Sequence, residues 1–176
     1  MQYRKVVFAG TMGAGKTTAI RALSEIAPMS TEVANRQTEL HGKAQTTVAL
    51  DYGEIRFGDG EKLCLYGTPG QDRFAFMWPI LARGALGVVV LVDHSQVDPI
   101  SDMTRYLERF AELNRDMPFV IGVGRLDSNP AFGLNQYVDS LSQRGWPYPV
   151  LAVDVRRKED ALLLIDVLLT MVENTR

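Results

Sequence analysis

A run of residues near the start of the chain has the types and spacing that hold phosphate groups. The segment GTMGAGKT, residues 10–17, matches the pattern G-x-x-x-x-G-K-[ST], follows an apolar strand-like run and opens a helix-like segment. In such a loop the backbone amides turn inward around phosphate oxygens, Lys16 reaches the β and γ phosphates, and the Thr17 hydroxyl ligates Mg²⁺. We therefore predict a site for a nucleoside triphosphate with Mg²⁺.

The alternative interpretation of this segment is a glycine-rich turn with a solvated lysine. A turn alone requires neither Lys nor Thr at these spacings, so we favour the phosphate-binding loop. The predicted phosphate-binding residues are Gly10, Met12, Gly13, Ala14, Gly15, Lys16, Thr17 and Thr18.

Strand-like and helix-like segments alternate along the rest of the chain, which favours a mostly parallel sheet with helices on both faces. Strands are expected at about residues 3–9, 47–57, 61–66, 85–92, 118–123 and 148–153. Helices are expected at about residues 15–27, 71–82, 100–115, 132–144 and 158–173. Gly58 to Gly60 leave no room for a helix, so the second and third strands should form an antiparallel hairpin. We expect one α/β domain over residues 1–176, with a six-stranded sheet, one antiparallel strand and five helices.

One stretch, Pro28 to Gln45, is longer than an ordinary connection and is a candidate functional loop.

Composition narrows the class of protein. The chain has 46% hydrophobic residues and a formal net charge of −2, which does not favour nucleic-acid binding. The single cysteine, Cys64, lies in a strand pattern, as expected of a core residue in a reducing compartment. No signal peptide, membrane span or lipidation motif is recognisable. We predict a cytoplasmic protein without a direct membrane anchor, which partners could recruit to a membrane.

Three further segments, QTTVALDYG, GTPGQDRF and VIGVGRLDSN, follow the phosphate loop in the order found in one family. With them, the chain resembles a Ras-superfamily small GTPase over its whole length, with the P-loop NTPase fold of a G domain. It is most similar to the bacterial MglA-like and conservon-type GTPases. The resemblance implies GTP, GDP and Mg²⁺ as ligands and a roadblock-domain protein as a regulator, with an exchange factor or sensor protein as a further partner.

The first of these segments matches switch I of the family. Thr47 stands four residues before Asp51, as does the threonine whose hydroxyl meets Mg²⁺ when GTP is bound. Thr46 is the alternative position, and two threonines can also be plain strand formers. Arg36, in the preceding loop, is a candidate for an arginine supplied in cis.

The second segment matches the switch II pattern D-x-x-G-Q. The resemblance implies that the Gly70 amide meets the γ phosphate and that Gln71 orients the attacking water. Gly67 departs from the pattern, because the family has an aspartate there that reaches Mg²⁺ through water. Without this acid we expect weaker Mg²⁺ binding and inefficient unaided hydrolysis; MglA-like members also lack the acid. The aromatic residues Phe74, Phe76 and Trp78 form either an effector surface or ordinary helix packing.

The third segment matches the guanine-reading pattern N-K-x-D. Asp127 would accept hydrogen bonds from guanine N1 and its exocyclic amine, and Arg125 would lie over the base. Gly124 replaces the asparagine, so we expect the usual link between this loop and the phosphate loop to be lost. The backbone at Val155 is the candidate for the remaining base contact. Alternatively, this segment is only a turn that caps the next helix.

A rival interpretation starts from Asp93, which ends the aliphatic run VVVLVD. Such an acid is typical of ATPases, where it would hold Mg²⁺, and the protein would then be a P-loop ATPase. At Met12, where Ras itself has glycine, a long side chain disfavours an activator's arginine along that route.

We favour a GTP-binding molecular switch with slow, partner-stimulated hydrolysis. The alternatives are a GTP-binding scaffold that rarely hydrolyses its nucleotide and the ATPase that uses Asp93.

Overall fold

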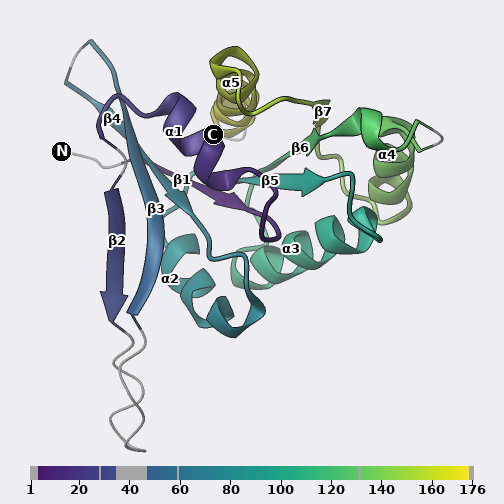
Figure 1. The fold of residues 1–176 in the computed structure, drawn as a ribbon, viewed down its shortest axis with the longest axis horizontal. Helices are drawn as coiled ribbons and strands as arrows, with labels where there is room; N and C mark the ends of the chain where they lie inside the picture. The colour runs from purple at the N-terminus through teal and green to yellow at the C-terminus, as the bar shows by residue number, and fades with distance from the viewer. Residues whose placement is uncertain (1–3, 28, 35–46, 59, 131, 175–176) are drawn as a thin grey trace, which may run out of the picture.

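Among the residues that the structure describes, seven strands form one sheet in the order β2-β3-β4-β1-β5-β6-β7 (Figure 1). The computed structural model describes residues 4–27, 29–34, 47–58, 60–130 and 132–174. The strands are β1 Arg4–Ala9, β2 Met29–Ala34, β3 Thr47–Arg56, β4 Lys62–Gly67, β5 Gly87–Asp93, β6 Phe119–Gly124 and β7 Val150–Ala152. Strand β3 is antiparallel to both of its neighbours, and the other neighbouring pairs are parallel. The predicted α/β class with one antiparallel strand is confirmed.

The predicted hairpin between the second and third expected strands is present. It joins β3 to β4, with Arg56 paired with Lys62 and Asp51 paired with Gly67. Gly60 has a φ of 83°, a left-handed conformation that glycine adopts without steric cost. The hairpin therefore sets which residues of β3 face which residues of β4.

The expected number of six strands is wrong, because β2 lies within the stretch that we predicted to be irregular. Its sequence, MSTEVA, has no clear apolar alternation, so periodicity does not mark it as a strand. It pairs with the edge of β3, from Met29 opposite Tyr52 to Ala34 opposite Thr47. This strand depends on a neighbouring backbone edge rather than on its own pattern.

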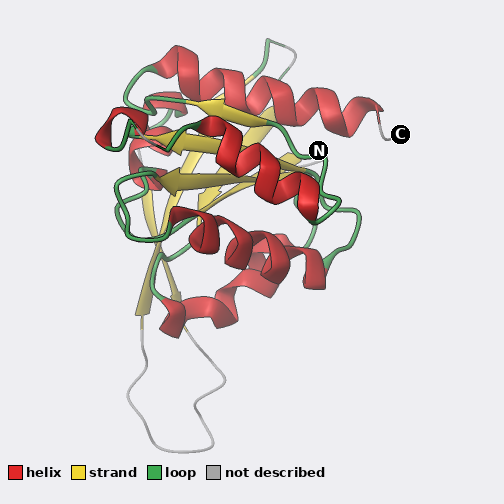
Figure 2. Cartoon of the chain, turned by 90° about the vertical axis from the view of Figure 1, so that its right-hand side faces the viewer, coloured by secondary structure: helices red, strands yellow, loops and turns green. Residues whose placement is uncertain are grey.

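Five α-helices lie in the described part of the chain, as predicted, and they cover both faces of the sheet (Figures 1 and 2). They are α1 Lys16–Leu23, α2 Trp78–Ala82, α3 Pro99–Leu113, α4 Leu134–Gln143 and α5 Lys158–Asn174. Helices α1 and α5 pack with one set of strand side chains, which includes Phe8 and Leu65. Helices α2, α3 and α4 pack with the opposite set, which includes Val7 and Val90. The result is a three-layer α/β/α structure.

The expected helix over residues 71–82 is only partly helical. Residues Asp72–Met77 form a 3₁₀ helix, η2, and α2 begins at Trp78. Pro79 lies in the first turn of α2, where its missing N–H costs nothing, and it would break a helix that continued from residue 71. Trp78 is 4% exposed and stacks on Tyr106 and Phe110 of α3. It is a packing residue, whereas Phe74 and Phe76 are only partly buried.

Parallel strands β1, β5 and β6 end at the same edge of the sheet. Segments predicted to bind nucleotide follow β1 and β6, and β5 ends at Asp93, the metal acid of the ATPase alternative. In α/β proteins of this type, ligands bind at the carboxyl ends of the strands. The fold therefore brings the phosphate loop and the segments around Asp93 and Asp127 to one edge.

Candidate functional site

The phosphate loop, residues 10–17, joins β1 to α1. Gly10, Gly13 and Gly15 have φ values of 145°, 84° and 99°, which a residue with a side chain rarely adopts. A Cβ at Gly10 would also lie 2.2 Å from the carbonyl oxygen of Leu91. These positions explain why the loop is rich in glycine, and they leave its backbone as the surface of the phosphate site.

Lys16 is held inside the phosphate loop, with only 7% of the residue exposed. Its Nζ donates to the carbonyl oxygens of Gly10 and Thr11, each at 2.7 Å. Burial lowers the pKa of Lys16 to about 8, and the charge of Asp51 opposes part of that effect. A bound phosphate would favour the charged form, so the loop presents a cation that is ready for an anionic ligand.

Thr17, the predicted Mg²⁺ ligand of the loop, contacts a carboxylate that the sequence analysis did not assign to the site. Its hydroxyl donates to Oδ2 of Asp51 at 2.5 Å. Asp51 is the β3 residue paired with Gly67, the position of the missing acid. A Cβ at Gly67 would lie 3.1 Å from Cβ of Asp51 and 3.2 Å from its Oδ2. Asp51 thus brings a carboxylate to the space that a side chain at position 67 would enter.

A signal for Asp51 was present in the sequence. Asp51 and Gly67 lie equally far before and after position 59, so a hairpin centred there pairs them. We had used Asp51 only to place Thr47. Thr47 itself begins β3, but the position of its side chain lies outside what the structure describes, as do Arg36 and Thr46.

The segment after β4 lies directly against the phosphate loop. A Cβ at Gly70 would lie 2.6 Å from the backbone nitrogen of Met12, so only glycine fits there. The side-chain amide of Gln71 contacts the sulfur of Met12 at 3.9 Å. Met12 is 70% exposed. The structure therefore brings Gly70, Gln71 and Met12 together at the mouth of the phosphate loop.

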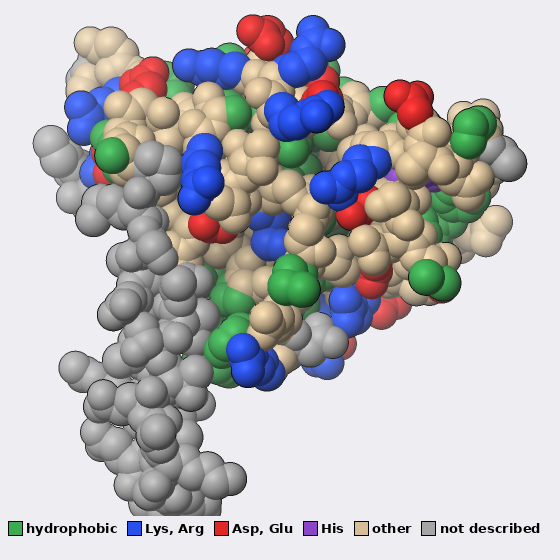
Figure 3. All heavy atoms as spheres, in the orientation of Figure 1, with side chains coloured by type: hydrophobic (Ala, Val, Ile, Leu, Met, Phe, Trp, Pro, Cys, Tyr) green, Lys and Arg blue, Asp and Glu red, His purple; other side chains and the backbone are tan. Residues whose placement is uncertain are grey.

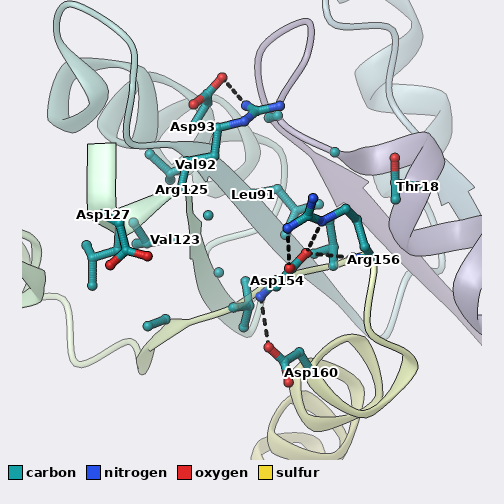
Figure 4. Close-up of a pocket in the computed structure, with 18 residues that line it drawn as sticks. Thr18, Leu91, Val92, Asp93, Val123, Arg125, Asp127, Asp154, Arg156 and Asp160 are labelled. Carbon is teal, nitrogen blue, oxygen red and sulfur yellow. Dashed lines mark hydrogen bonds and ion pairs between the residues drawn. The ribbon is translucent and has the colours of Figure 1, made fainter. Parts of the chain in front are cut away.

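A pocket of about 500 Å³ adjoins this loop at the carboxyl ends of β5 and β6 (Figure 4). Its size is in the range of small-molecule sites. Figure 3 shows several Lys and Arg side chains distributed over this face of the molecule. The predicted site residues in its lining are Ala14, Gly15, Thr18, Arg125, Asp127 and Val155. The pocket connects the predicted phosphate and base subsites.

The predicted base-reading segment, residues 124–127, was expected to have lost its link to the phosphate loop. This expectation is wrong, because Arg125 provides a link. Its guanidinium donates to the carbonyl oxygen of Gly13 at 3.2 Å and forms an ion pair with Asp93. Gly124 indeed carries no side chain, but the longer arginine beside it spans the gap. Figure 4 shows this guanidinium directed at Asp93.

Asp93 has its carboxylate oxygens occupied. It accepts from the backbone and hydroxyl of Ser95 at 3.1 and 2.6 Å, from Gln96 at 3.1 Å and from Arg125. Burial raises its pKa, but the hydrogen bonds from Ser95, Gln96 and Arg125 outweigh burial and hold the pKa at about 2. Asp51, which contacts the predicted Mg²⁺ ligand Thr17, is therefore a better candidate than Asp93 for a carboxylate that binds the metal.

Asp127 lies in η3, the 3₁₀ turn Leu126–Ser128, and lines the pocket. On the opposite side, Asp154 pairs with Arg156 through contacts of 2.8 and 2.6 Å, and its backbone nitrogen donates to Asp160 at 2.8 Å (Figure 4). These contacts fix the backbone that presents Val155.

Among the described residues, no group of three or more His, Cys, Asp or Glu side chains could hold a metal by itself. Mg²⁺ in nucleotide sites commonly uses one or two carboxylates together with substrate phosphates and water. Thr17 and Asp51 fit that donor set. Also among these residues, no helix is long and apolar enough to cross a membrane.

Together, the fold, the phosphate loop and the adjoining pocket define a nucleotide-binding protein of the P-loop class. The model of a family described as "conserved hypothetical ATP binding protein" matches residues 28–143, more than half of the chain. The chain belongs to this family.

Two curated proteins are similar to the chain. The uncharacterized protein MJ1339 of Methanocaldococcus jannaschii is 30% identical over 125 residues, which cover 70% of each chain. The Ras and EF-hand domain-containing protein of Danio rerio is 29% identical over 132 residues, which cover 72% of this chain and 18% of the zebrafish protein.

Proposed function

We propose that the protein is a GTP-binding switch that hydrolyses GTP slowly. The observation that carries the proposal is the pocket that joins the phosphate loop to Asp127. A carboxylate there can accept from both N1–H and the 2-amino group of guanine, whereas adenine has no proton on N1 and carries its amine at position 6. The similarity to a protein named for its Ras domain supports the same interpretation.

Residues of the phosphate site fit Mg²⁺. Thr17 and Asp51 would hold the ion, with Thr47 as the further ligand that the resemblance implies. When bound, Mg²⁺ supplies positive charge beside the β and γ phosphates. Lys16 and the loop amides add to that charge, and they would stabilise the GDP leaving group as the bond to the γ phosphate breaks.

For hydrolysis, Gln71 is the residue that would orient the attacking water, and the Gly70 amide would contact the γ phosphate. In the structure, Gln71 contacts the sulfur of Met12 instead. The catalytic arrangement therefore requires the Gln71 side chain to turn from Met12 towards the phosphate. Such a requirement favours slow hydrolysis that a partner accelerates by reorienting this segment.

A second candidate function is ATP binding, because the matched family is described as ATP binding. Competition of GTP and ATP against a fluorescent guanine nucleotide, with and without Mg²⁺, separates the two. We expect GTP to compete at least about 100-fold better than ATP, because adenine would leave the Asp127 carboxylate without a hydrogen-bond donor. If ATP competes better, the guanine assignment is wrong.

The scaffold alternative is tested by single-turnover hydrolysis with Gln71→Ala. Gln143→Ala, at the exposed end of α4, is the matched control. We expect Gln71→Ala to lower the rate at least about tenfold, a barrier increase of about 1.4 kcal/mol, and the control to keep the parent rate. An unchanged rate in Gln71→Ala would favour the scaffold.

The partner proposals rest on the resemblance. A roadblock-domain regulator, and an exchange factor or sensor protein, would act on the segment of Gly70 and Gln71 in the cytoplasm or at a membrane to which they recruit the protein. Purified roadblock-domain proteins can be added to the single-turnover assay. If no tested regulator binds or changes the rate, the proposal of this partner class loses its support.

A further inference from the structure

Two consecutive residues at the end of β5 hold the base-reading segment on both sides of Asp127. We call Asp93 and His94 the β5 anchor. They are 5% and 2% exposed, and both are polar. Asp93 pairs with Arg125, two positions before Asp127, and His94 contacts the backbone oxygen of Asn129, two positions after it.

The imidazole of His94 makes a directed chain of hydrogen bonds. Nε2 lies 3.3 Å from the carbonyl oxygen of Asn129, and Nδ1 lies 2.8 Å from the hydroxyl of Tyr137. A carbonyl oxygen can only accept, so Nε2 of the neutral ring carries the proton and Nδ1 accepts from Tyr137. The ring also stacks on Phe132, with centroids 5.1 Å apart. His94 therefore has one orientation, and that orientation fixes Asn129.

The backbone of the base-reading segment is itself constrained. The backbone nitrogen of His94 donates to the carbonyl oxygen of Gly124 at 3.1 Å. Arg125 has a φ of 58° and is the one residue other than glycine with a positive φ in the part of the chain that the structure describes. Such a conformation persists where surrounding contacts impose it. In this structure, the Arg125 side chain contacts Asp93 and the carbonyl oxygen of Gly13.

We infer that Asp93 and His94 are positioning residues that aim the Asp127 carboxylate at guanine and thereby set base selectivity. The inference rests on the proposed function, in which Asp127 reads guanine. Gly124 has no side chain with which to hold the base-reading segment. The β5 anchor holds this segment from the neighbouring strand instead. Arg125 extends the same connection to the phosphate loop through Gly13.

The test compares two substitutions at His94 that each keep one half of its hydrogen-bond chain. The amide nitrogen of glutamine can replace Nε2, so His94→Gln keeps the donor to Asn129. The amide oxygen of asparagine can replace Nδ1, so His94→Asn keeps the acceptor for Tyr137 and loses the donor to Asn129. Both leave a polar amide in the same buried space. They differ in whether the base-reading segment stays attached.

The readout is the affinity ratio of GDP to inosine diphosphate, measured by competition against a fluorescent guanine nucleotide on the full chain. Hypoxanthine keeps N1–H and lacks the exocyclic amine, so the ratio reports how well Asp127 is aimed at that amine. A change that only loosens the fold weakens both ligands equally and leaves the ratio unchanged. We expect a ratio of at least about tenfold in the parent.

We expect His94→Gln to keep most of the parent ratio and His94→Asn to reduce it several-fold. Arg125→Met removes the contact between Asp93 and the base-reading segment. It does not disturb the buried core, because the Arg125 side chain is 56% exposed. Its ratio should also fall several-fold. Arg109→Met, an exposed position on α3, is the matched control and should keep the parent ratio.

If His94→Asn and Arg125→Met both keep the parent ratio, the β5 anchor does not position Asp127 and the inference is wrong, while the proposed function stands. If the parent itself binds inosine diphosphate or ADP as tightly as GDP, the proposed guanine site fails, and the inference fails with it. Should His94→Asn not fold, Arg125→Met decides the result.

Discussion

The carboxylate of Asp51 on β3 accepts a hydrogen bond of 2.5 Å from the hydroxyl of Thr17 at the start of α1. Asp51 stands opposite Gly67, where the resemblance to Ras-superfamily GTPases implies an acid. The site therefore has a carboxylate at the Mg²⁺ position that the resemblance implies, although it comes from a different strand.

The first prediction is that a carboxylate at position 67 on β4 can partly replace the carboxylate of Asp51 on β3 in Mg²⁺ binding. Asp51→Gly should weaken Mg²⁺-dependent binding of GTP about tenfold or more, because a charged hydrogen-bonding group is lost from the site. The double variant Asp51→Gly with Gly67→Asp should regain part of that loss. Removing the Asp51 side chain leaves Cδ1 of Ile20, at 3.1 Å, as the close neighbour of a Cβ at position 67. Titration of Mg²⁺ at fixed GTP measures both. Gly67→Asp alone should bind poorly, because two carboxylates would crowd one space. Equal Mg²⁺ affinity in Asp51→Gly and parent would remove Asp51 from the metal site.

The second prediction concerns Lys16, whose pKa burial lowers to about 8 from the ordinary 10.5. Phosphate binds the charged form, so above pH 8 binding must take up a proton, and GDP affinity should fall by up to about tenfold per pH unit. The unfolded chain keeps a proton that the folded loop releases. For this group the free energy of unfolding of the free protein therefore increases with pH between about 8 and 10.5. Lys16→Arg remains charged and should lose both effects. A parent whose GDP affinity follows that of Lys16→Arg from pH 7 to 9 would contradict the prediction.

The third prediction uses the chemistry of the base. Asp127→Asn replaces two acceptor oxygens by one acceptor and one donor group, which suits xanthine, whose position 2 is a carbonyl. We expect this variant to lose GDP affinity about 100-fold or more and to gain affinity for xanthosine diphosphate. Competition with the two diphosphates measures the exchange. Asp139→Asn on the exposed face of α4 is a suitable control. If Asp127→Asn keeps the parent's preference for GDP, Asp127 does not read the base.

The fourth prediction concerns the packing of α2 on α3. Trp78 stacks on Tyr106 and Phe110 with centroid distances of 4.9 and 5.5 Å. Trp78→Ala should lower the free energy of unfolding by about 3–5 kcal/mol, as for other large buried aromatics. Trp78→Phe should cost much less, because the indole N–H has no hydrogen-bond partner within the described residues. Denaturant unfolding measures both. If Trp78→Phe lowered the free energy of unfolding as much as Trp78→Ala, the indole N–H would have a hydrogen-bond partner that Phe cannot replace.

Several features could be predicted because they depend on residues close together in the sequence. The phosphate loop needs glycines at fixed spacings for its backbone, followed at once by Lys16 and Thr17. The alternation of strands and helices follows from local periodicity, and the hairpin around Gly58 to Gly60 follows from its short connection. The α/β class, the antiparallel strand and the five helices of the described chain were accordingly correct.

Other features could not be predicted, because they arise from contacts between distant segments. Strand β2 has no apolar alternation, and pairing with β3 forms it. The link from Arg125 to Gly13 joins residues 112 positions apart, so the glycine at position 124 wrongly suggested a missing connection. His94 lies in no motif, and its partner Tyr137 is 43 positions away.

The phosphate loop and the alternating α/β pattern can be read from the chain, because loop conformation and strand periodicity are properties of contiguous residues. The acid beside Thr17 and the contacts that hold the segment of Asp127 become visible only in the folded protein. Those relations depend on strand register and on side chains that meet across the sheet edge, where the hydrogen bonds of buried polar groups must be satisfied by whichever partners the fold brings near.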